Sequence, residues 1–277
     1  MGSERKALFF DIDGTISDFD GTVSPLTVEA LKLAKEKGHY LFVCTGRPKC
    51  HVDLSLLPGE YDGMISCAGA LVEYQGKTIK DLVIPKKDLI RLDDILKKEG
   101  IYYLVQCADR VAYEEADEQK IREAMVARRM FSLPPELAEV LERGNMTVKS
   151  YRDMEDAEKI MYFGSKLSVD ELAALLGPDF SIALSSMEPS GTTKGEIALS
   201  TMTKSLGMET MLQHIGVARE DSFAFGDSMN DMDMLEYAQV GVAMGNAADY
   251  VKASADYVTR SVAEGGIYEA MKHWGLI

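Results

Sequence analysis

Four consecutive apolar residues, Ala7-Leu8-Phe9-Phe10, lead directly into an acidic motif near the start of the chain. An apolar run without alternation is typical of a strand that is buried on both faces. Such strands belong to parallel sheets, whose neighbouring strands are joined by crossover helices. Because open α/β sheets bind ligands at the carboxyl ends of their strands, the motif that follows, Asp11-Ile12-Asp13-Gly14-Thr15, is a candidate site.

The same pattern recurs as Asp18-Phe19-Asp20-Gly21-Thr22. Only Ile16 and Ser17 separate it from the first copy, so no buried strand precedes it. Asp and Gly are also common turn formers. We therefore expect the second copy to form a solvated or substrate-entry loop without a catalytic role.

Strand-like and helix-like stretches alternate along most of the chain. We expect buried strands at 40–44 and 63–66, a helix from Pro25 to Gly38, and a hairpin of 71–74 and 77–79 around Gln75-Gly76. From Lys194 we expect a helix to Leu206, strands at 222–225 and 240–244, and a closing helix after Glu264. This order predicts an α/β fold with a parallel-sheet core formed by residues 1–83 and 188–277. An inserted α+β domain occupies 84–187.

Charge and composition exclude several classes of partner. The 277 residues include 45 Asp and Glu against 30 Lys and Arg, a formal charge of −15, which disfavours nucleic acid and anionic membranes. No apolar run approaches the ~18 residues of a membrane span. The four cysteines show no zinc-binding spacing. We expect a cytoplasmic protein, either a monomer or a weak homo-oligomer, that binds neither nucleic acid nor membrane.

Three further motifs are expected beside the carboxyl edge of this sheet. Thr45-Gly46-Arg47 offers a hydroxyl, a backbone N–H and a guanidinium to an anion. Lys194-Gly195 would place an ammonium group at the start of a helix. The third motif, Gly226-Asp227-Ser228-Met229-Asn230-Asp231, is acidic. Clustered carboxylates repel one another without a cation, and oxygen ligands favour Mg²⁺, so we predict a magnesium site.

The four motifs, in this order, resemble those of the haloacid dehalogenase superfamily, and the insert resembles the α/β (type IIB) cap of its Cof-type branch. The resemblance implies a Rossmann-like three-layer core and a phosphatase acting on a small phosphorylated metabolite. It also implies a role for each motif residue. Asp11 would be the nucleophile that forms an aspartyl phosphate, and Asp13 the general acid and base.

The remaining roles follow from the same resemblance. Asp11, Asp227 and the backbone carbonyl of Asp13 would bind Mg²⁺. The phosphoryl group would be held by Thr45, Gly46, Lys194 and Asn230. Asp231 would orient Lys194 or metal-bound water.

The resemblance leaves some alternatives open. The acid at position 13 resembles both the phosphatases and the phosphomutases of the superfamily, and a phosphometabolite-binding regulator with little turnover is a third alternative. The chain also has Ala68-Gly69-Ala70 where Cof-type relatives usually show Asn-Gly-Ala. Arg47 either binds substrate or pairs with a surface carboxylate.

One further motif has a weak functional signal. Gly241-Val242-Ala243-Met244-Gly245-Asn246 contains a glycine pair, but the acidic partner of a dinucleotide site is missing. We interpret it as a strand followed by a turn.

Overall fold

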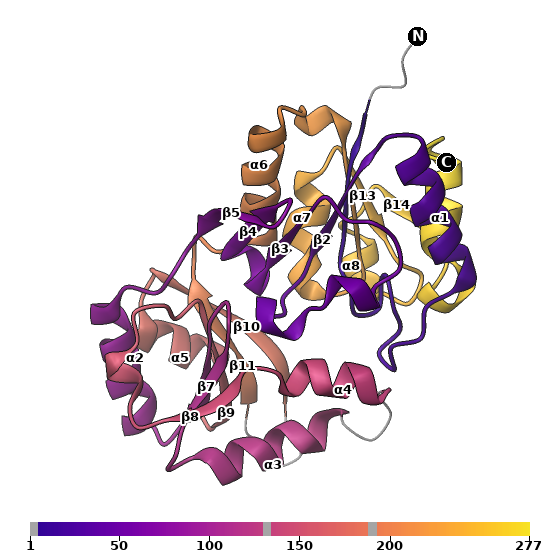
Figure 1. The fold of residues 1–277 in the computed structure, drawn as a ribbon. Helices are drawn as coiled ribbons and strands as arrows, with labels where there is room; N and C mark the ends of the chain where they lie inside the picture. The colour runs from indigo at the N-terminus through magenta and orange to yellow at the C-terminus, as the bar shows by residue number, and fades with distance from the viewer. Residues whose placement is uncertain (1–4, 130–133, 188–192) are drawn as a thin grey trace. The chain divides into compact units, whose positions relative to one another are not determined.

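The computed structural model describes residues 5–129, 134–187 and 193–277. These residues form two compact units (Figure 1). The first unit comprises the described residues of Met1–Arg47, Asp53–Asp81 and Thr203–Ile277, and the second comprises those of Pro48–Val52 and Leu82–Met202.

The first unit is built on an eight-stranded sheet. In spatial order its strands are β14 (Tyr257–Val258), β13 (Val240–Ala243), β12 (Ser222–Gly226), β1 (Ala7–Phe10), β2 (Tyr40–Cys44), β3 (Gly63–Ser66), β4 (Leu71–Tyr74) and β5 (Lys77–Asp81). The strands from β14 to β3 are parallel, whereas β4 and β5 form an antiparallel hairpin at the edge. The carboxyl ends of β1, β2 and β12 therefore lie at one edge of the sheet.

Helices cover both faces of this sheet (Figure 1). They are α1 (Pro25–Glu36), α6 (Lys204–Ile215), α7 (Met232–Tyr237), α8 (Asp249–Lys252) and α9 (Gly266–His273). Apolar residues of α6 and α7 pack with Phe9, Phe42 and Ile65 of the strands, while α1 and α9 pack together. This three-layer arrangement confirms the predicted α/β fold with a parallel-sheet core.

The second unit contains a six-stranded sheet with its own helices. The strand order is β10 (Phe180–Met187), β11 (Thr193–Leu199), β9 (Lys159–Ser165), β6 (Tyr102–Gln106), β7 (Val111–Glu114) and β8 (Asn145–Val148). The helices are α2 (Lys86–Lys98), α3 (Glu118–Arg129), α4 (Pro135–Glu142) and α5 (Val169–Leu176). All strand pairs are antiparallel except β7 with β8.

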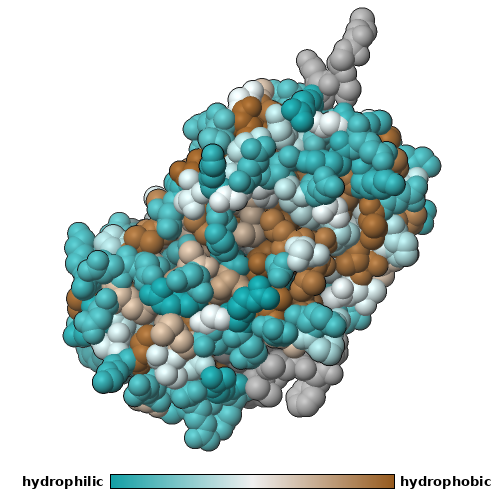
Figure 2. Space-filling view, viewed as in Figure 1, coloured by the Kyte–Doolittle hydropathy of each residue, from teal (hydrophilic) through white to brown (hydrophobic). Residues whose placement is uncertain are grey.

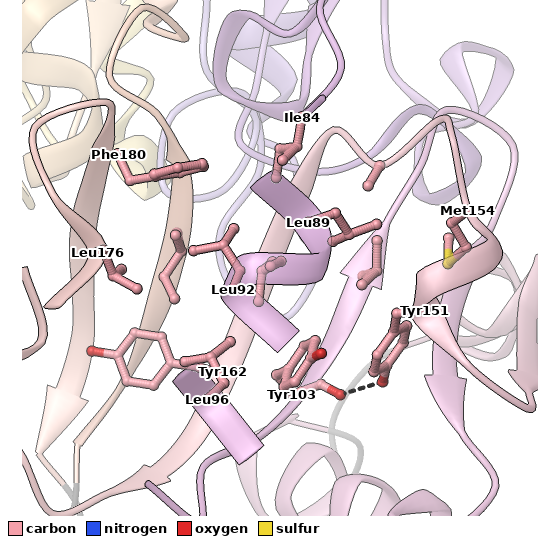
Figure 3. Packing of buried hydrophobic residues seen from close by; sticks show 14 of the residues in the cluster. Ile84, Leu89, Leu92, Leu96, Tyr103, Tyr151, Met154, Tyr162, Leu176 and Phe180 are labelled. Atoms are coloured by element: carbon pink, nitrogen blue, oxygen red, sulfur yellow. Dashed lines mark hydrogen bonds between the residues drawn. The ribbon is translucent and has the colours of Figure 1, made fainter. Parts of the chain in front are cut away.

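Alternation along β6 divides the second unit into two apolar clusters. Tyr103 and Val105 face the larger cluster, which includes Leu89 and Leu92 of α2 and Leu172 of α5. Figure 3 shows this packing, in which the Tyr151 hydroxyl donates to the Tyr103 carbonyl at 2.6 Å. Leu104, between the two, faces a smaller cluster with Ile121 of α3. Period-2 alternation therefore supplies apolar side chains to both faces of this sheet.

Short 3₁₀ helices occupy several connections. They are η1 (Lys49–His51), η2 (Leu54–Leu56), η3 (Cys67–Gly69), η4 (Tyr151–Asp153), η5 (Arg219–Asp221), η6 (Met229–Asp231) and η7 (Val262–Glu264). Most of the surface in Figure 2 is hydrophilic, in agreement with the charged composition. Among the described helices, none has the length and apolar character that crossing a membrane requires.

One predicted element is wrong. The helix expected to begin at Lys194 is instead strand β11, which pairs with β10 on one side and β9 on the other. The helix of this region begins ten residues later, at Lys204. As a result the second unit extends to Met202, whereas the sequence placed the end of the insert at residue 187.

Candidate active site

The loop after β1 places the first acidic motif against the loop after β12. The Asp11 N–H donates to the Phe225 carbonyl at 3.0 Å, and the Gly14 N–H closes the loop by donating to the Ser17 carbonyl at 2.7 Å. Gly14 has φ +85°, and a Cβ atom there would lie 2.2 Å from Asp227 Oδ2. Only glycine allows the backbone to lie this close to the Asp227 carboxylate.

Lys204 links two of the carboxylates at the edge of the sheet. Its Nζ donates to Asp11 Oδ1 at 2.7 Å and to Asp231 Oδ1 at 2.5 Å, and its side chain is fully buried. Burial lowers the pKa of Lys204, but the charges of Asp11 and Asp231 outweigh burial and hold that pKa well above its usual value. The ammonium group is therefore a permanent positive charge beside Asp11.

Asp231 uses both of its oxygens within the site. While Oδ1 accepts from Lys204, Oδ2 accepts from the Asp227 N–H at 3.0 Å, the Ser228 N–H at 2.9 Å and the Ser228 hydroxyl at 3.0 Å. These contacts shape the loop after β12 and aim the Lys204 ammonium group at Asp11.

Three carboxylates can supply oxygens to one cation. Asp11, Asp227 and Asp231 each offer an oxygen, and these oxygens lie within 4.8 Å of one another. Burial raises the pKa of Asp11 to about 8 despite the charge of Lys204, and burial followed by the charge of Asp231 raises the pKa of Asp227 to about 7. A divalent cation would favour the ionised form of both groups, and an all-oxygen donor set suits Mg²⁺.

Arg47 forms a bidentate pair with Asp13. Its Nε donates to Asp13 Oδ2 at 2.8 Å, and its Nη2 donates to Oδ1 at 2.6 Å. Burial lowers the pKa of Arg47, but the hydrogen bonds and charge of Asp13 outweigh it, so that the pKa is raised. Arg47 does pair with a carboxylate, but this carboxylate is the largely buried Asp13 of the first acidic motif and not the surface group that the sequence predicts.

The motif after β2 meets the motif after β12 at Gly46. The Thr45 side chain is buried, and its Oγ1 accepts from the Arg47 N–H at 3.2 Å. A Cβ atom on Gly46 would lie 3.2 Å from Asn230 Nδ2, which makes the two residues neighbours. A hydroxyl, a backbone N–H and an amide thus belong to two loops that meet at Gly46.

Lys194 does not take the place that the sequence predicted for it. It lies within β11 of the second unit, and the lysine that contacts Asp11 is Lys204. The signal for Lys204 is present in the sequence, because Thr203 precedes it and caps the helix by accepting from the Leu206 N–H at 3.1 Å. The Lys194-Gly195 pair, which the sequence predicts to begin the helix, lies within a strand.

The second acidic motif forms a local turn. The Gly21 N–H donates to the Asp18 carbonyl at 2.9 Å, and the Thr22 N–H donates to Asp20 Oδ1 at 2.8 Å. This hydrogen bond lowers the pKa of the Asp20 carboxyl group. Asp20 is exposed to solvent. These contacts fit the loop that the sequence predicts for the second copy.

Two polar residues that the sequence did not single out contact the Asp227 carboxylate. The Thr15 hydroxyl donates to Oδ1 at 3.4 Å, and the Asn246 amide donates to Oδ2 at 3.4 Å. Thr15 could have been recognised from its place in the first motif. Asn246 had no such signal, since it follows β13 within the segment interpreted only as a strand and a turn.

Comparison with known proteins decides the family of this fold and this site. A family model described as haloacid dehalogenase-like hydrolase matches residues 8–271. The chain belongs to this family. It is 30% identical over 266 residues to pyridoxal phosphate phosphatase YbhA of Escherichia coli, with 91% of this haloacid dehalogenase-like chain and 92% of the relative covered. It is 27% identical to 5-amino-6-(5-phospho-D-ribitylamino)uracil phosphatase YitU of Bacillus subtilis, with 99% of each chain covered.

A solved structure of a subclass IIB sugar phosphatase from the same superfamily is similar throughout. It shares 30% identity and a TM-score of 0.75, covering 98% of this haloacid dehalogenase-like chain and 100% of that chain. The predicted membership in the superfamily is therefore confirmed, together with its hydrolase class.

Proposed function

We propose that this protein is a Mg²⁺-dependent phosphatase that hydrolyses a small phosphorylated metabolite through an aspartyl phosphate on Asp11. The main support is the burial of Asp11 beside a fixed cation, Lys204, and beside a second carboxylate, Asp227. Asp13, two residues after the nucleophile, supplies a second carboxyl group within the same loop.

The residues present fit a magnesium ion. Asp11 and Asp227 are the carboxylates that would hold it, with the Asp13 backbone carbonyl. The oxygens of Asp231 accept hydrogen bonds of 2.5 to 3.0 Å, whereas the donors to Asp227 lie farther away, at 3.4 Å. When bound, Mg²⁺ would offset negative charge on the phosphoryl oxygens and keep the nucleophile ionised. In the absence of a cation, burial raises the pKa values of Asp11 and Asp227, because ionised carboxylates are destabilised away from water and near one another.

The first half of the reaction transfers the phosphoryl group to the protein. An Asp11 oxygen attacks phosphorus, so that the Asp11 O–P bond forms while the ester O–P bond breaks. The proton of the Asp13 carboxylic acid goes to the departing alkoxide oxygen. Lys204 holds Asp11 Oδ1, which leaves Oδ2 to act as the attacking atom.

The second half restores the carboxylate. Asp13, now ionised, takes a proton from a water molecule whose oxygen attacks the aspartyl phosphate. The bond between phosphorus and Asp11 breaks, and inorganic phosphate leaves. Arg47 is a positioning residue in this scheme, since its two hydrogen bonds orient the Asp13 carboxylate between the two proton transfers.

Four groups of the first unit would bind the phosphoryl oxygens. They are the Thr45 hydroxyl, the Gly46 N–H, the Asn230 amide and the Lys204 ammonium group. Preorganised donors of this kind stabilise the charge that develops in the transition state. They also provide the local positive potential that a chain with a net charge of −15 needs in order to bind an anion.

The second unit is the part that we propose as the substrate-selecting cap. The compared relatives are named for pyridoxal phosphate and for a phosphorylated ribitylaminouracil, and the similar structure is named as a sugar phosphatase. These names share a phosphate ester on a small molecule. We infer the same substrate class here, a phosphorylated sugar or cofactor.

Release of inorganic phosphate tests this function directly. A panel of phosphorylated sugars and cofactors would be assayed with and without Mg²⁺, using the wild type, Asp11→Asn and Asp20→Asn. We expect Mg²⁺-dependent turnover in the wild type, loss of turnover in Asp11→Asn, and near-normal turnover in Asp20→Asn. The two variants make the same chemical change in the same five-residue pattern, so Asp20→Asn is a matched control.

Rapid acid quenching with ³²P-labelled substrate tests the covalent step. Label should remain on wild-type protein and be absent from Asp11→Asn. Full activity in Asp11→Asn would disprove the mechanism. Binding of phosphometabolites without phosphate release would instead favour a regulator, and dependence on a bisphosphate activator would favour a phosphomutase.

A further inference from the structure

Asn246 lies in the turn that follows β13. The turn is held by backbone hydrogen bonds: the Met244 N–H donates to the Gly226 carbonyl at 2.9 Å, and the Gly245 N–H donates to the Arg260 carbonyl at 2.9 Å. Asn246 itself is exposed at the surface, although its amide group reaches inward. Its role is therefore decided by the contacts of this amide, since the side chain is not part of the apolar core.

Three partners determine the orientation of the Asn246 amide. Oδ1 accepts from the Val262 N–H at 2.9 Å. Nδ2 could not take the place of Oδ1 there, because Nδ2 and the Val262 N–H are both donors. Nδ2 consequently faces the other way, where it donates to the Gly14 carbonyl at 2.9 Å and to Asp227 Oδ2 at 3.4 Å. One amide thus joins η7, the loop after β1 and the loop after β12.

The amide acts where the two loops pack tightly against each other. A Cβ atom on Gly14 would lie 2.2 Å from the same Asp227 oxygen that Asn246 contacts, so loop and carboxylate are already in tight packing. The Thr15 hydroxyl contacts the other oxygen, Oδ1, at 3.4 Å. Thr15 and Asn246 therefore each donate to one oxygen of Asp227. Thr15 belongs to the loop after β1, whereas Asn246 lies outside both loops.

We propose that Asn246 is a positioning residue that fixes the Asp227 carboxylate relative to the loop after β1. Carboxylates from the loops after β1 and β12 can then bind one Mg²⁺ ion. This inference rests on the proposed function, since it concerns the same metal site. Both contacts with Asp227 are long, so they orient the carboxylate and leave its oxygens able to bind a cation. Residues that orient metal ligands through hydrogen bonds typically affect metal affinity about 10–100-fold when they are removed.

The test compares Asn246→Ala with Gln239→Ala. Gln239 is also exposed and carries an amide, but it precedes β13, whereas Asn246 follows that strand. Isothermal titration with Mg²⁺ alone would give the dissociation constant of each protein, and circular dichroism without metal would give each thermal midpoint. Phosphate release at increasing Mg²⁺ would then show whether added metal restores turnover.

We expect Asn246→Ala to weaken Mg²⁺ binding by about tenfold or more. Its thermal midpoint without metal should stay close to that of the wild type, and saturating Mg²⁺ should restore most of kcat. Gln239→Ala should match the wild type in all three measurements.

Three outcomes would overturn the inference, and one of them also rejects the proposed function. If wild type and Asn246→Ala bind Mg²⁺ equally well, the positioning role is wrong while the phosphatase proposal stands. Unfolding of Asn246→Ala in metal-free buffer would show that the role is structural. A wild type that binds no Mg²⁺ would remove both proposals together.

Discussion

Lys204 is held between two carboxylates with none of its side chain exposed. Replacing it by an apolar residue would leave Asp11 and Asp231 buried without their cation. Removal of one member of a buried ion pair costs about 3–5 kcal/mol of stability because the remaining charge is uncompensated. Loss of one preorganised cation or donor at a transition state costs about a hundredfold or more in rate.

We therefore expect Lys204→Met to reduce both turnover and the free energy of unfolding by about these amounts. Lys194→Met is the matched control, because Lys194 is partly exposed within β11. It should have smaller effects in phosphate release and in urea unfolding. The assignment would be contradicted if Lys194→Met abolished turnover and Lys204→Met did not.

At the residue scale, candidates that directly follow a buried strand could be predicted from the sequence. Asp11 follows β1, Thr45 follows β2 and Asp227 follows β12, and the strand ends are readable from short apolar runs. Lys204 could not be assigned in this way, because it begins a helix and does not directly follow a buried strand. Asn246 illustrates a further limit, since its partners Gly14 and Val262 are distant in sequence and only the fold brings them together.

His39 makes the stability of the first unit depend on pH. Burial, followed by the charge of Lys37, lowers the pKa of His39, and its Nδ1 accepts from the Lys6 N–H at 3.1 Å. A protonated Nδ1 could not accept this bond. Since the folded pKa lies below the unfolded value of about 6.5, the stabilisation is complete above that pH and is lost as pH falls towards the folded pKa.

Thermal midpoints measured across this acidic range should therefore fall more steeply for the wild type than for His39→Gln. His273→Gln is the control, because His273 is exposed and its ring stacks on Tyr257 at 4.5 Å. It should keep the wild-type pH dependence. Parallel curves for the wild type and His39→Gln would show that His39 is not the group responsible.

At the scale of elements, the turn η3 supports two parts of the site. The Cys67 N–H donates to the Arg47 carbonyl at 2.7 Å, and the Ala68 N–H donates to the Thr45 carbonyl at 3.0 Å. Cys67 and Ala68 both have positive φ, of 50° and 56°. Ala68 thus keeps the left-handed backbone here without the side-chain amide that the Cof-type pattern usually has at this position.

Gly69 in the same turn lies against the start of α6. It has φ +101°, and a Cβ atom there would lie 2.0 Å from the Thr203 carbonyl oxygen, one residue before Lys204. Gly76 also has positive φ, but a Cβ atom there would meet nothing within 4 Å. Gly76→Ala should therefore cost only the backbone strain, about 1–2 kcal/mol.

We expect Gly69→Ala to lower the free energy of unfolding more than Gly76→Ala, and to lower kcat as well because Lys204 moves with Thr203. Chemical denaturation and phosphate release would measure the two effects. Equal losses of stability, with kcat unchanged in both variants, would show that η3 does not support the helix start.

The mistaken helix at Lys194 has a physical explanation at this scale. A Lys-Gly pair can indicate a helix start from its charge, but burial along β11 largely alternates, as it does in a strand with two different faces. Strands β1 and β2 were predicted correctly because they carry continuous apolar runs, which do not resemble a helix start. Strand β11 is stabilised by pairing with β9 and β10, which local sequence does not reveal.

At the scale of the whole molecule, the second unit has an apolar core of its own. The larger cluster extends from Ile84 to Ile197 and draws all of its members from the segment Leu82–Met202. We expect a fragment of residues 82–202 to unfold cooperatively on heating and to give a well-dispersed ¹H–¹⁵N spectrum. Non-cooperative unfolding with a collapsed spectrum would mean that this core depends on the first unit.

The two ends of this unit differ in how clearly the sequence signals them. Its start, near Ile84, coincides with a visible change of pattern after the β4–β5 hairpin. The sequence does not signal the end of the unit, because β11 pairs in a sheet whose other strands come earlier in the chain. Pro48–Val52 was missed for a similar reason, since the Cys50 N–H reaches the Ala108 carbonyl across 58 residues of sequence.

The β4–β5 hairpin has a consequence for how such a gene can change. Because β4 runs antiparallel to both β3 and β5, β5 ends at the same edge of the sheet as β3. Thr203 begins the returning segment at that edge, against Gly69. The chain therefore departs and returns on one side of an otherwise continuous sheet, so two crossovers, one after β5 and one before Thr203, could exchange the whole intervening segment for another while every strand of the sheet stays in register.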